Sequence, residues 1–230
     1  MIKKVEIAGV MLDNYNVREI LSEIEKDMGS SLMKTIEEVD MAMILNAEKD
    51  EHYKEVLENL SFSIMAETGI LSAIGENSTQ RYHEIENNLF FEEFFKRVER
   101  NRKKVFIIGK SVDKIEQFRG VLEQEFPEII IANTSALDDC VGAYESVIND
   151  INAAGADVVF SIIPSPEQEM FLKEYQGLIN AGMWYGIGEN KKITPNHGIW
   201  NKIKNIVRFK RFHKTLISLE ELDFEKEVIK

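Results

Sequence analysis

Short apolar runs alternate with amphipathic segments along most of this chain, and this alternation constrains the fold more than any other feature. The runs that predict buried strands cover residues 4–7, 41–45, 62–66, 104–108, 129–132, 157–163 and 183–187. Segments with helical periodicity lie at residues 17–28, 49–60, 89–101, 112–125, 144–153 and 166–178. Strands that alternate with helices predict βαβ units and a covered parallel sheet. We therefore expect an α/β fold, a doubly wound, mostly parallel sheet of the Rossmann-like type.

The composition excludes several classes of protein. Of the 230 residues, 44% are hydrophobic and 30% are charged, which is typical of a soluble globular chain. No apolar run approaches the roughly 18 residues of a membrane span, and residues 1–10 lack a signal-peptide pattern. The single cysteine, Cys140, fits a reducing cytosol and excludes a Cys-based zinc site, and the four histidines show no metal-ligand spacing, so we expect no metal or other cofactor. The net charge of −12 argues against a nucleic-acid partner.

Residues 191–219 differ in charge from the rest of the chain. They contain eight basic residues and no acidic one, whereas the remainder carries 20 basic against 40 acidic residues. Apolar residues recur there at steps of three and four, which predicts a helix with an apolar stripe beside a basic face. Such a helix suits an anionic membrane surface. The alternatives are an ordinary packed helix, a contact with the protein's own acidic body, or a subunit contact in a homo-oligomer. We expect an α/β domain over residues 1–190 and a basic appendage over residues 191–230.

Open α/β sheets bind ligands beyond the carboxyl ends of their strands, so the residues after each expected strand are candidates. Gly109, Lys110 and Ser111 follow one strand and open a helix, whose free N–H groups suit a diphosphate. The alternative is a plain strand-to-helix turn, because the spacing matches neither a Walker loop nor GxGxxG. The missing GxGxxG also disfavours a dinucleotide-dependent dehydrogenase.

Two further loops at the same edge carry carboxylates. Glu67 is either a general base or a first-turn carboxylate that complements a helix dipole. Ser165 and Gln168 flank Pro166 and Glu167, an order that predicts a capping box at a helix start. The capping box leaves Glu169 and the position of this loop at the cleft unexplained.

Five segments, in a fixed order, carry a resemblance to a known family. They are VEIAGVMLDNYNVREILSEIE, ILNAEKDEHYKEVLENLSFSIMAETG, QRYHEIE, KVFIIGKSVDKIEQFRGVLEQEFPEIIIA and INDINAAGADVVFSIIPSPEQEMFL. In order and spacing they resemble the WecG/TagA/CpsF glycosyltransferases, which make lipid-linked cell-envelope glycans in bacteria. The basic segment after Pro195 resembles that family's C-terminal appendage.

The resemblance implies an inverting, metal-independent hexosyltransferase that moves a sugar, often N-acetylmannosamine, from a UDP-sugar to a polyprenyl-diphosphate-linked acceptor. It implies a cytoplasmic protein held peripherally at the inner face of the membrane by residues 191–219. Glu67 matches the family's proposed base, Asn46 the asparagine of its "TPN" motif and Arg81 the arginine of its "ERV" motif. The residues expected to bind the substrates are Gly109, Lys110, Ser111, Ser165, Gln168, Glu169, Arg208 and Arg211.

Several positions depart from the family pattern. Glu67 replaces an aspartate, Glu84 replaces a glycine, and Glu167 replaces a lysine beside the expected diphosphate. The threonine of "TPN" is absent. Extra negative charge disfavours a doubly anionic diphosphate. A catalytically impaired family member that serves as a binding or scaffold protein in surface-glycan assembly is therefore the alternative to an active transferase.

Overall fold

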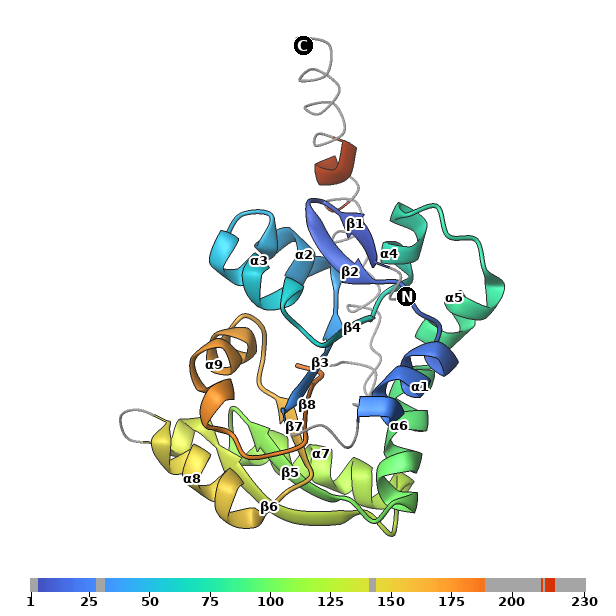
Figure 1. Ribbon diagram of the computed structural model, residues 1–230. Coiled ribbons are helices and arrows are strands. Elements are labelled where there is room, and N and C mark those ends of the chain that lie inside the picture. Colours follow the sequence, from blue (N-terminus) through green and yellow to red (C-terminus); the bar gives the residue numbers. More distant parts are fainter. Residues whose placement is uncertain (1–3, 28–31, 141–143, 189–211, 213, 218–230) are drawn as a thin grey trace.

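The computed structural model describes residues 4–27, 32–140, 144–188, 212 and 214–217 (Figure 1). Its centre is a six-stranded parallel sheet in the order β4-β3-β8-β7-β5-β6. The strands are β3 (Lys34–Val39), β4 (Phe62–Met65), β5 (Lys104–Gly109), β6 (Ile130–Ala136), β7 (Val158–Ile162) and β8 (Met183–Gly186). The predicted fold class, a doubly wound parallel α/β sheet, is confirmed.

A separate antiparallel hairpin precedes the sheet. It pairs β1 (Lys4–Ile7) with β2 (Val10–Asp13) through a two-residue turn. Both turn residues, Ala8 and Gly9, have positive φ angles, of 50° and 77°, as a tight hairpin turn that matches the strand twist requires. Asp13 at the end of β2 hydrogen-bonds to Ser63 of β4, which holds the hairpin against the sheet edge.

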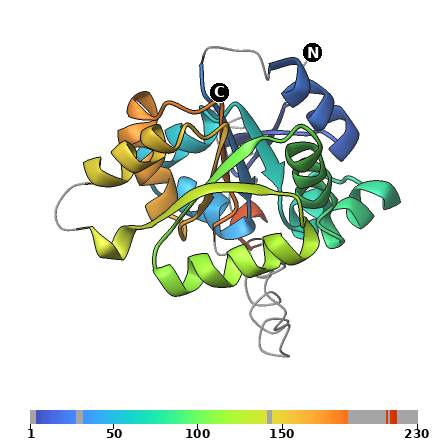
Figure 2. The same cartoon turned by 90° about the horizontal axis from the view of Figure 1, so that it is seen from below.

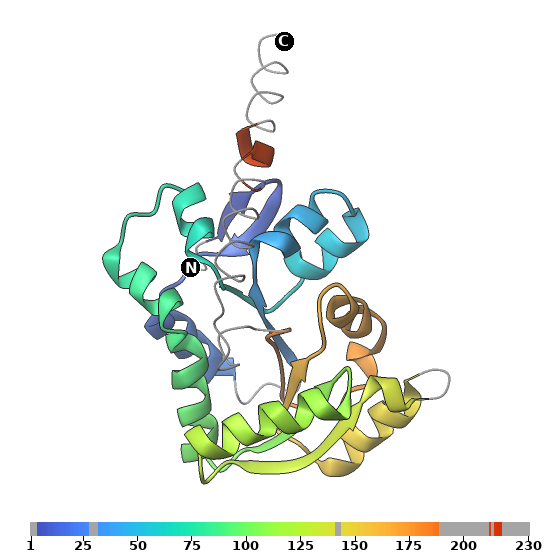
Figure 3. The ribbon, with the colours of Figure 1, turned by 180° about the vertical axis from the view of Figure 1, so that it is seen from behind.

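Helices cover both faces of the sheet (Figures 1 and 2). On one face lie α2 (Met41–Ala47), α3 (Glu51–Glu58), α8 (Glu145–Ala154) and α9 (Glu167–Tyr175), and on the other α1 (Val17–Asp27), α6 (Leu89–Arg100) and α7 (Val112–Glu125). Each face has its own buried apolar cluster, because alternate strand residues point to opposite sides. Two more helices, α4 (Thr68–Ala73) and α5 (Thr79–Glu86), connect β4 to α6. Figure 3 shows α1 beside α6 from behind.

One predicted strand is wrong. Residues 41–45 form most of helix α2, and the strand of this unit is β3, just before it. The Asp40 side chain accepts a hydrogen bond from the Met43 N–H at 2.9 Å and so begins the helix. The apolar run is the buried side of a short helix, with Met41, Met43 and Ile44 in the core.

The predicted basic appendage lies almost wholly outside the described residues. Phe212 is an exception: its side chain is fully buried and belongs to the same apolar cluster as α2, α3, α8 and α9, and Leu216 packs against that cluster. Arg208 and Arg211 lie outside the described residues. Among the helices that are described, none combines the length and apolarity needed to cross a membrane.

Candidate functional site

The carboxyl ends of the parallel strands meet at one edge of the sheet, and four candidate residues lie there. Glu67 follows β4, Lys110 follows β5, and Ser165 and Gln168 follow β7. This is the edge at which open α/β sheets bind their ligands. Sequence reasoning therefore placed these four residues at the correct edge of the sheet.

Glu67 joins the end of β4 to the start of helix α2. It occupies the position before α4 but makes no side-chain cap with that helix. Its Oε2 instead accepts a hydrogen bond of 3.0 Å from the backbone N–H of Met41, the first residue of α2. A helix N-terminus stabilises negative charge, so the Glu67 carboxylate complements the start of α2. Both sequence interpretations of Glu67 remain open, but the helix it complements is α2 and not the one it precedes.

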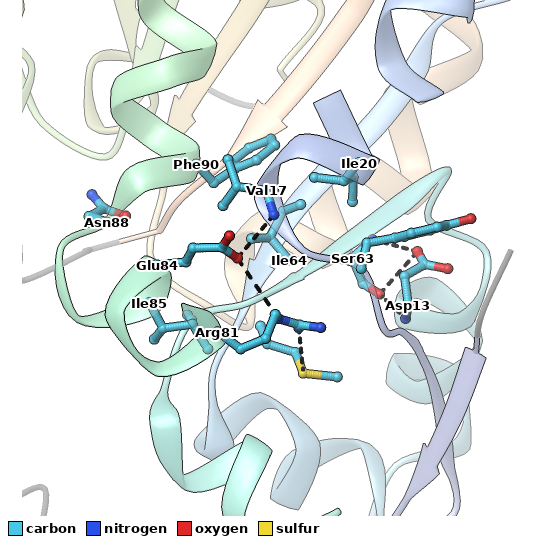
Figure 4. A pocket seen from close by; sticks show the side chains of 13 residues that line it. Asp13, Val17, Ile20, Ser63, Ile64, Arg81, Glu84, Ile85, Asn88 and Phe90 are labelled. Carbon is cyan, nitrogen blue, oxygen red and sulfur yellow. Dashed lines mark hydrogen bonds and ion pairs between the residues drawn. The ribbon is translucent and has the colours of Figure 1, made fainter. Parts of the chain in front are cut away.

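A hollow of about 40 Å³ lies at the end of β4 (Figure 4). Met65 and Ala66, which precede Glu67, line one side of it, and Arg81 of α5 lines another. The Arg81 guanidinium donates to Asn14 Oδ1 at 2.8 Å, and its Nη2 reaches the Met65 sulfur at 3.9 Å. Burial lowers the pKa of Arg81, but an arginine remains charged in proteins. The structure therefore places Arg81 near the end of β4.

Glu84, where the related family has a glycine, pairs with this arginine. Its Oε2 lies 4.0 Å from Arg81 Nε and accepts the backbone N–H of Val17 at 3.1 Å, while its Oε1 accepts from Gln80 at 2.8 Å. The negative charge of Glu84 acts against the effect of burial on the pKa of Arg81. Part of the positive charge in the hollow is thus compensated from within the chain.

Lys110 is also paired. Its Nζ lies 2.6 Å from Glu167 Oε2. The glutamate that replaces the family's lysine therefore forms an ion pair with Lys110, the residue that we expect to bind the diphosphate. The hydrogen bond to Glu167 raises the pKa of Lys110. Packing alone explains the glycine at position 109, because a Cβ there would lie 2.8 Å from Ile115 and 2.9 Å from Ile162. Ser111 precedes α7 without a side-chain cap.

The predicted capping box at Ser165 is wrong. Pro166, not Ser165, occupies the cap position of α9, and no side-chain cap hydrogen bond forms. The Ser165 hydroxyl lies 2.7 Å from the hydroxyl of Tyr53 in α3 instead. Gln168 is buried against Gly186 of β8, where an added Cβ would lie 2.5 Å from Gln168 Nε2. Only glycine at position 186 leaves room for this glutamine.

Behind that loop, two glutamates are buried together. Glu169 of α9 and Glu37 of β3 have no exposed surface. Burial raises the pKa of Glu169 to about 7, and burial together with the charge of Glu169 raises the pKa of Glu37 well above its ordinary value. Seven buried side-chain polar atoms of the described residues lack a hydrogen-bond partner, and six of them belong to Glu37, Gln168, Glu169 and Trp184.

Glu37 was not predicted from the sequence, because the strand that contains it was not predicted. Two adjacent glutamates interrupt the apolar pattern of the β3 strand, so this strand does not look buried in the sequence. Its second glutamate, Glu38, faces the other side of the sheet and accepts a hydrogen bond of 2.6 Å from Tyr185. Within the described part of the chain, no group of three or more histidine, cysteine, aspartate or glutamate residues is placed to hold a metal ion.

Asn46 is not brought to this site. It was expected directly after a strand, but it lies near the end of helix α2 with an exposed side chain. The backbone carbonyl of Asn46 accepts hydrogen bonds from Lys49 and Asp50, as expected for a helix end. The expectation that Asn46 directly follows a strand is therefore wrong, and its match to the asparagine of "TPN" stays a prediction.

Comparison with known proteins identifies the family. The sequence model of the glycosyl transferase WecG/TagA/CpsF family matches residues 5–191. The chain belongs to this family. The WecG/TagA/CpsF match thus covers the hairpin, the whole parallel sheet and every described candidate residue.

Two relatives carry the same name, N-acetylglucosaminyldiphosphoundecaprenol N-acetyl-beta-D-mannosaminyltransferase. The protein of Staphylococcus aureus (strain NCTC 8325 / PS 47) is 22% identical over 192 residues, which are 83% of this chain and 75% of the relative. The protein of Bacillus subtilis (strain 168) is 25% identical over 176 residues, which are 76% of this chain and 68% of the relative. The predicted family resemblance is therefore confirmed.

Proposed function

We propose that this chain transfers an N-acetylmannosamine-type sugar from a UDP-sugar to a polyprenyl-diphosphate-linked acceptor in bacterial envelope or exopolysaccharide synthesis. Its membership of a glycosyl transferase family supports the reaction class. The names of the two relatives, which specify a mannosaminyl group and a diphosphoundecaprenol acceptor, support the substrates. The expected reaction is inverting and needs no metal ion.

In the proposed mechanism Glu67 is the general base. It removes the proton from the acceptor hydroxyl, the resulting oxygen attacks the anomeric carbon, and UDP leaves from the opposite face with the bonding electrons. One such displacement inverts the anomeric centre. Arg81 and Gln168 orient the reacting groups, and Lys110, Ser111 and Ser165 bind the diphosphate. Glu169 is buried behind Ser165 and supports that loop from within.

The observation that carries this proposal is the position of Glu67. It lies at the carboxyl end of β4, directly after residues that line a hollow containing Arg81. A base and a cation at the same end of one strand are what deprotonation beside a leaving diphosphate requires. The hydrogen bond from Met41 holds one oxygen of Glu67 in place.

Binding and turnover test the proposal separately. We expect UDP to raise the melting temperature of the full chain, because a ligand at about 100 times its dissociation constant stabilises the fold by about 2.7 kcal/mol. Glu67→Gln should lower turnover by about 100-fold or more while UDP binding persists. Glu125→Gln, at an exposed position at the end of α7, is the matched control and should behave as wild type. Full activity of Glu67→Gln would contradict the assignment of the base.

A second function is favoured by the two ion pairs at the site. Arg81 pairs with Glu84 and Lys110 with Glu167, so the positive charges of two candidate site residues are compensated by this chain's own carboxylates. This arrangement supports a non-catalytic binding or scaffold protein in surface-glycan assembly. The two functions differ in one result: the scaffold predicts no turnover with any UDP-sugar, whether or not UDP binds.

A further inference from the structure

One of the two buried glutamates is a neighbour of a candidate site residue. Glu37 of β3 is in register with Gly186 of β8, and residues in register on adjacent strands point to the same face of a sheet. A Cβ at Gly186 would lie 2.5 Å from Gln168 Nε2, so the Gln168 side chain packs over the strand next to Glu37. On its other side Glu37 is in register with Ser63 of β4, whose hydroxyl donates to Asp13.

The surroundings of Glu37 suit a protonated carboxyl group better than a charged one. Burial and the charge of Glu169 raise its pKa, and the nearby Trp184 N–H and Gln168 side chain offset this only in part. Neither side-chain oxygen of Glu37 has a hydrogen bond of ordinary geometry among the described residues. Ionisation of such a group is costly, because nothing replaces its lost hydration.

Glu169 of α9 meets the same conditions. Burial raises its pKa to about 7, and the nearby hydroxyls of Ser165 and Tyr53 offset this only in part. The charge of Asp40, just before α2, raises it further. Tyr53 stays neutral, because burial and the charge of Glu169 raise its own pKa. Among the described groups that act most strongly on the pKa of either glutamate, none is a cation.

We propose that Glu37 and Glu169 share one proton, and that this proton holds the loop before α9 in the position that binds the nucleotide-sugar donor. The proposal rests on the proposed transferase function and makes Glu37 a positioning residue, which acts through Gln168. Loss of the proton leaves two like charges in a buried space, and they move apart or draw in water. Because Glu169 directly follows Gln168 in the chain, either response displaces Gln168 from Gly186.

The affinity for the donor should therefore fall as pH rises. A donor that binds only the protonated form depends on the fraction of that form, which decreases by at most about tenfold per pH unit above the pKa of about 7. By the same linkage, donor binding at about pH 8 should take up a proton from the solvent.

Calorimetric titration of the full chain with UDP-N-acetylmannosamine at about pH 6.5 to pH 8.5 tests this dependence. Unlike the terminal phosphate of UDP, whose pKa is about 6, the diphosphate of a UDP-sugar does not titrate in this range. The wild-type affinity should fall by about tenfold. Glu37→Gln places a neutral amide that can donate to Glu169, so it should keep the high affinity throughout. Glu38→Gln, the same change in the next residue on the opposite face of β3, is the matched control and should follow wild type.

The NMR signal of the Trp184 indole N–H tests the shared proton without a ligand. The chain has two tryptophans, so Trp200→Phe identifies the signal. It should shift with pH over the same range in wild type and stay in place in Glu37→Gln.

Three results would overturn this inference alone: a Trp184 signal that does not shift, a wild-type donor affinity that is independent of pH, or a wild-type pH dependence that persists in Glu37→Gln. Absence of donor binding at every pH would overturn the proposed function, and the role of the proton in donor binding with it.

Discussion

At the scale of single residues, the buried pair Glu37 and Glu169 should make the stability of the fold depend on pH. The ordinary pKa of a glutamate is 4.5, and that of folded Glu169 is about 7. The native state therefore binds more protons than the unfolded state between these values, and the free energy of unfolding falls as pH rises from about 4.5 to about 7. The loss is about 3 kcal/mol for a shift of this size.

Urea unfolding at a series of pH values measures this loss. Glu37→Gln should flatten the profile, because it removes an ionisable group whose pKa is raised by burial and by the charge of Glu169. Glu125→Gln, exposed at the end of α7, should leave the profile unchanged. A wild-type stability that rises between pH 5 and pH 7 would show that the pair is ionised in the folded state.

The same residues show where single-residue reasoning from sequence ends. Glu67, Lys110 and Gln168 were placed at the carboxyl edge of the sheet, because residues after strands can be identified from the apolar runs. Arg81 of α5 was predicted from the family resemblance alone. Glu37 and Asp13 were not predicted, because nothing local distinguishes a buried acidic residue from a solvated one. Their burial follows from pairing between distant segments, such as Asp13 with Ser63, 50 residues away along the chain.

At the scale of elements, the start of helix α2, where we expected a strand, can be tested by mutation. Asp40→Ala should destabilise the fold by about 1 kcal/mol, because the Met43 N–H loses its acceptor. Asp40→Asn keeps a good cap and removes the same negative charge, so the difference between the two variants isolates the cap. Thermal and urea unfolding measure it. Equal stability of Asp40→Ala and Asp40→Asn would mean that the cap contributes nothing.

Most other elements could be predicted from periodicity alone. The helix over Val112–Glu125 has the predicted ends. The predicted strand 104–108 is one residue shorter than β5 at one end, and the predicted strand 157–163 is one residue longer than β7 at each end. Elements that were missed or changed lack a distinct periodic signal: α2 is a single apolar run of helical residues, and β3 holds two glutamates. Which side of such a short run is buried depends on the caps and neighbours it meets in the fold, and these are not local properties.

At the scale of the whole molecule, the basic segment 191–219 contrasts with a body that carries 40 acidic residues against 20 basic ones. Deletion of this segment would be a poor test of membrane binding. Phe212 is fully buried in the core, so its loss would uncover apolar surface and cost about 3–5 kcal/mol. Substitutions that remove charge and keep Phe212 avoid this problem.

We expect the wild-type chain to sediment with vesicles that contain anionic lipid, and to be released by salt, because exposed charges are screened within about 8–10 Å at 0.10–0.15 M. Replacing Lys202, Lys204, Arg208 and Lys210 by glutamine should abolish sedimentation, since each basic residue contributes about 1 kcal/mol near an anionic surface. The melting temperature should stay unchanged if Phe212 remains in place. Replacing Lys103, Lys104, Lys114 and Arg119 on the α/β domain by glutamine is the matched control for total charge. Equal loss in both variants would mean that overall charge, and not the C-terminal segment, determines binding to the membrane.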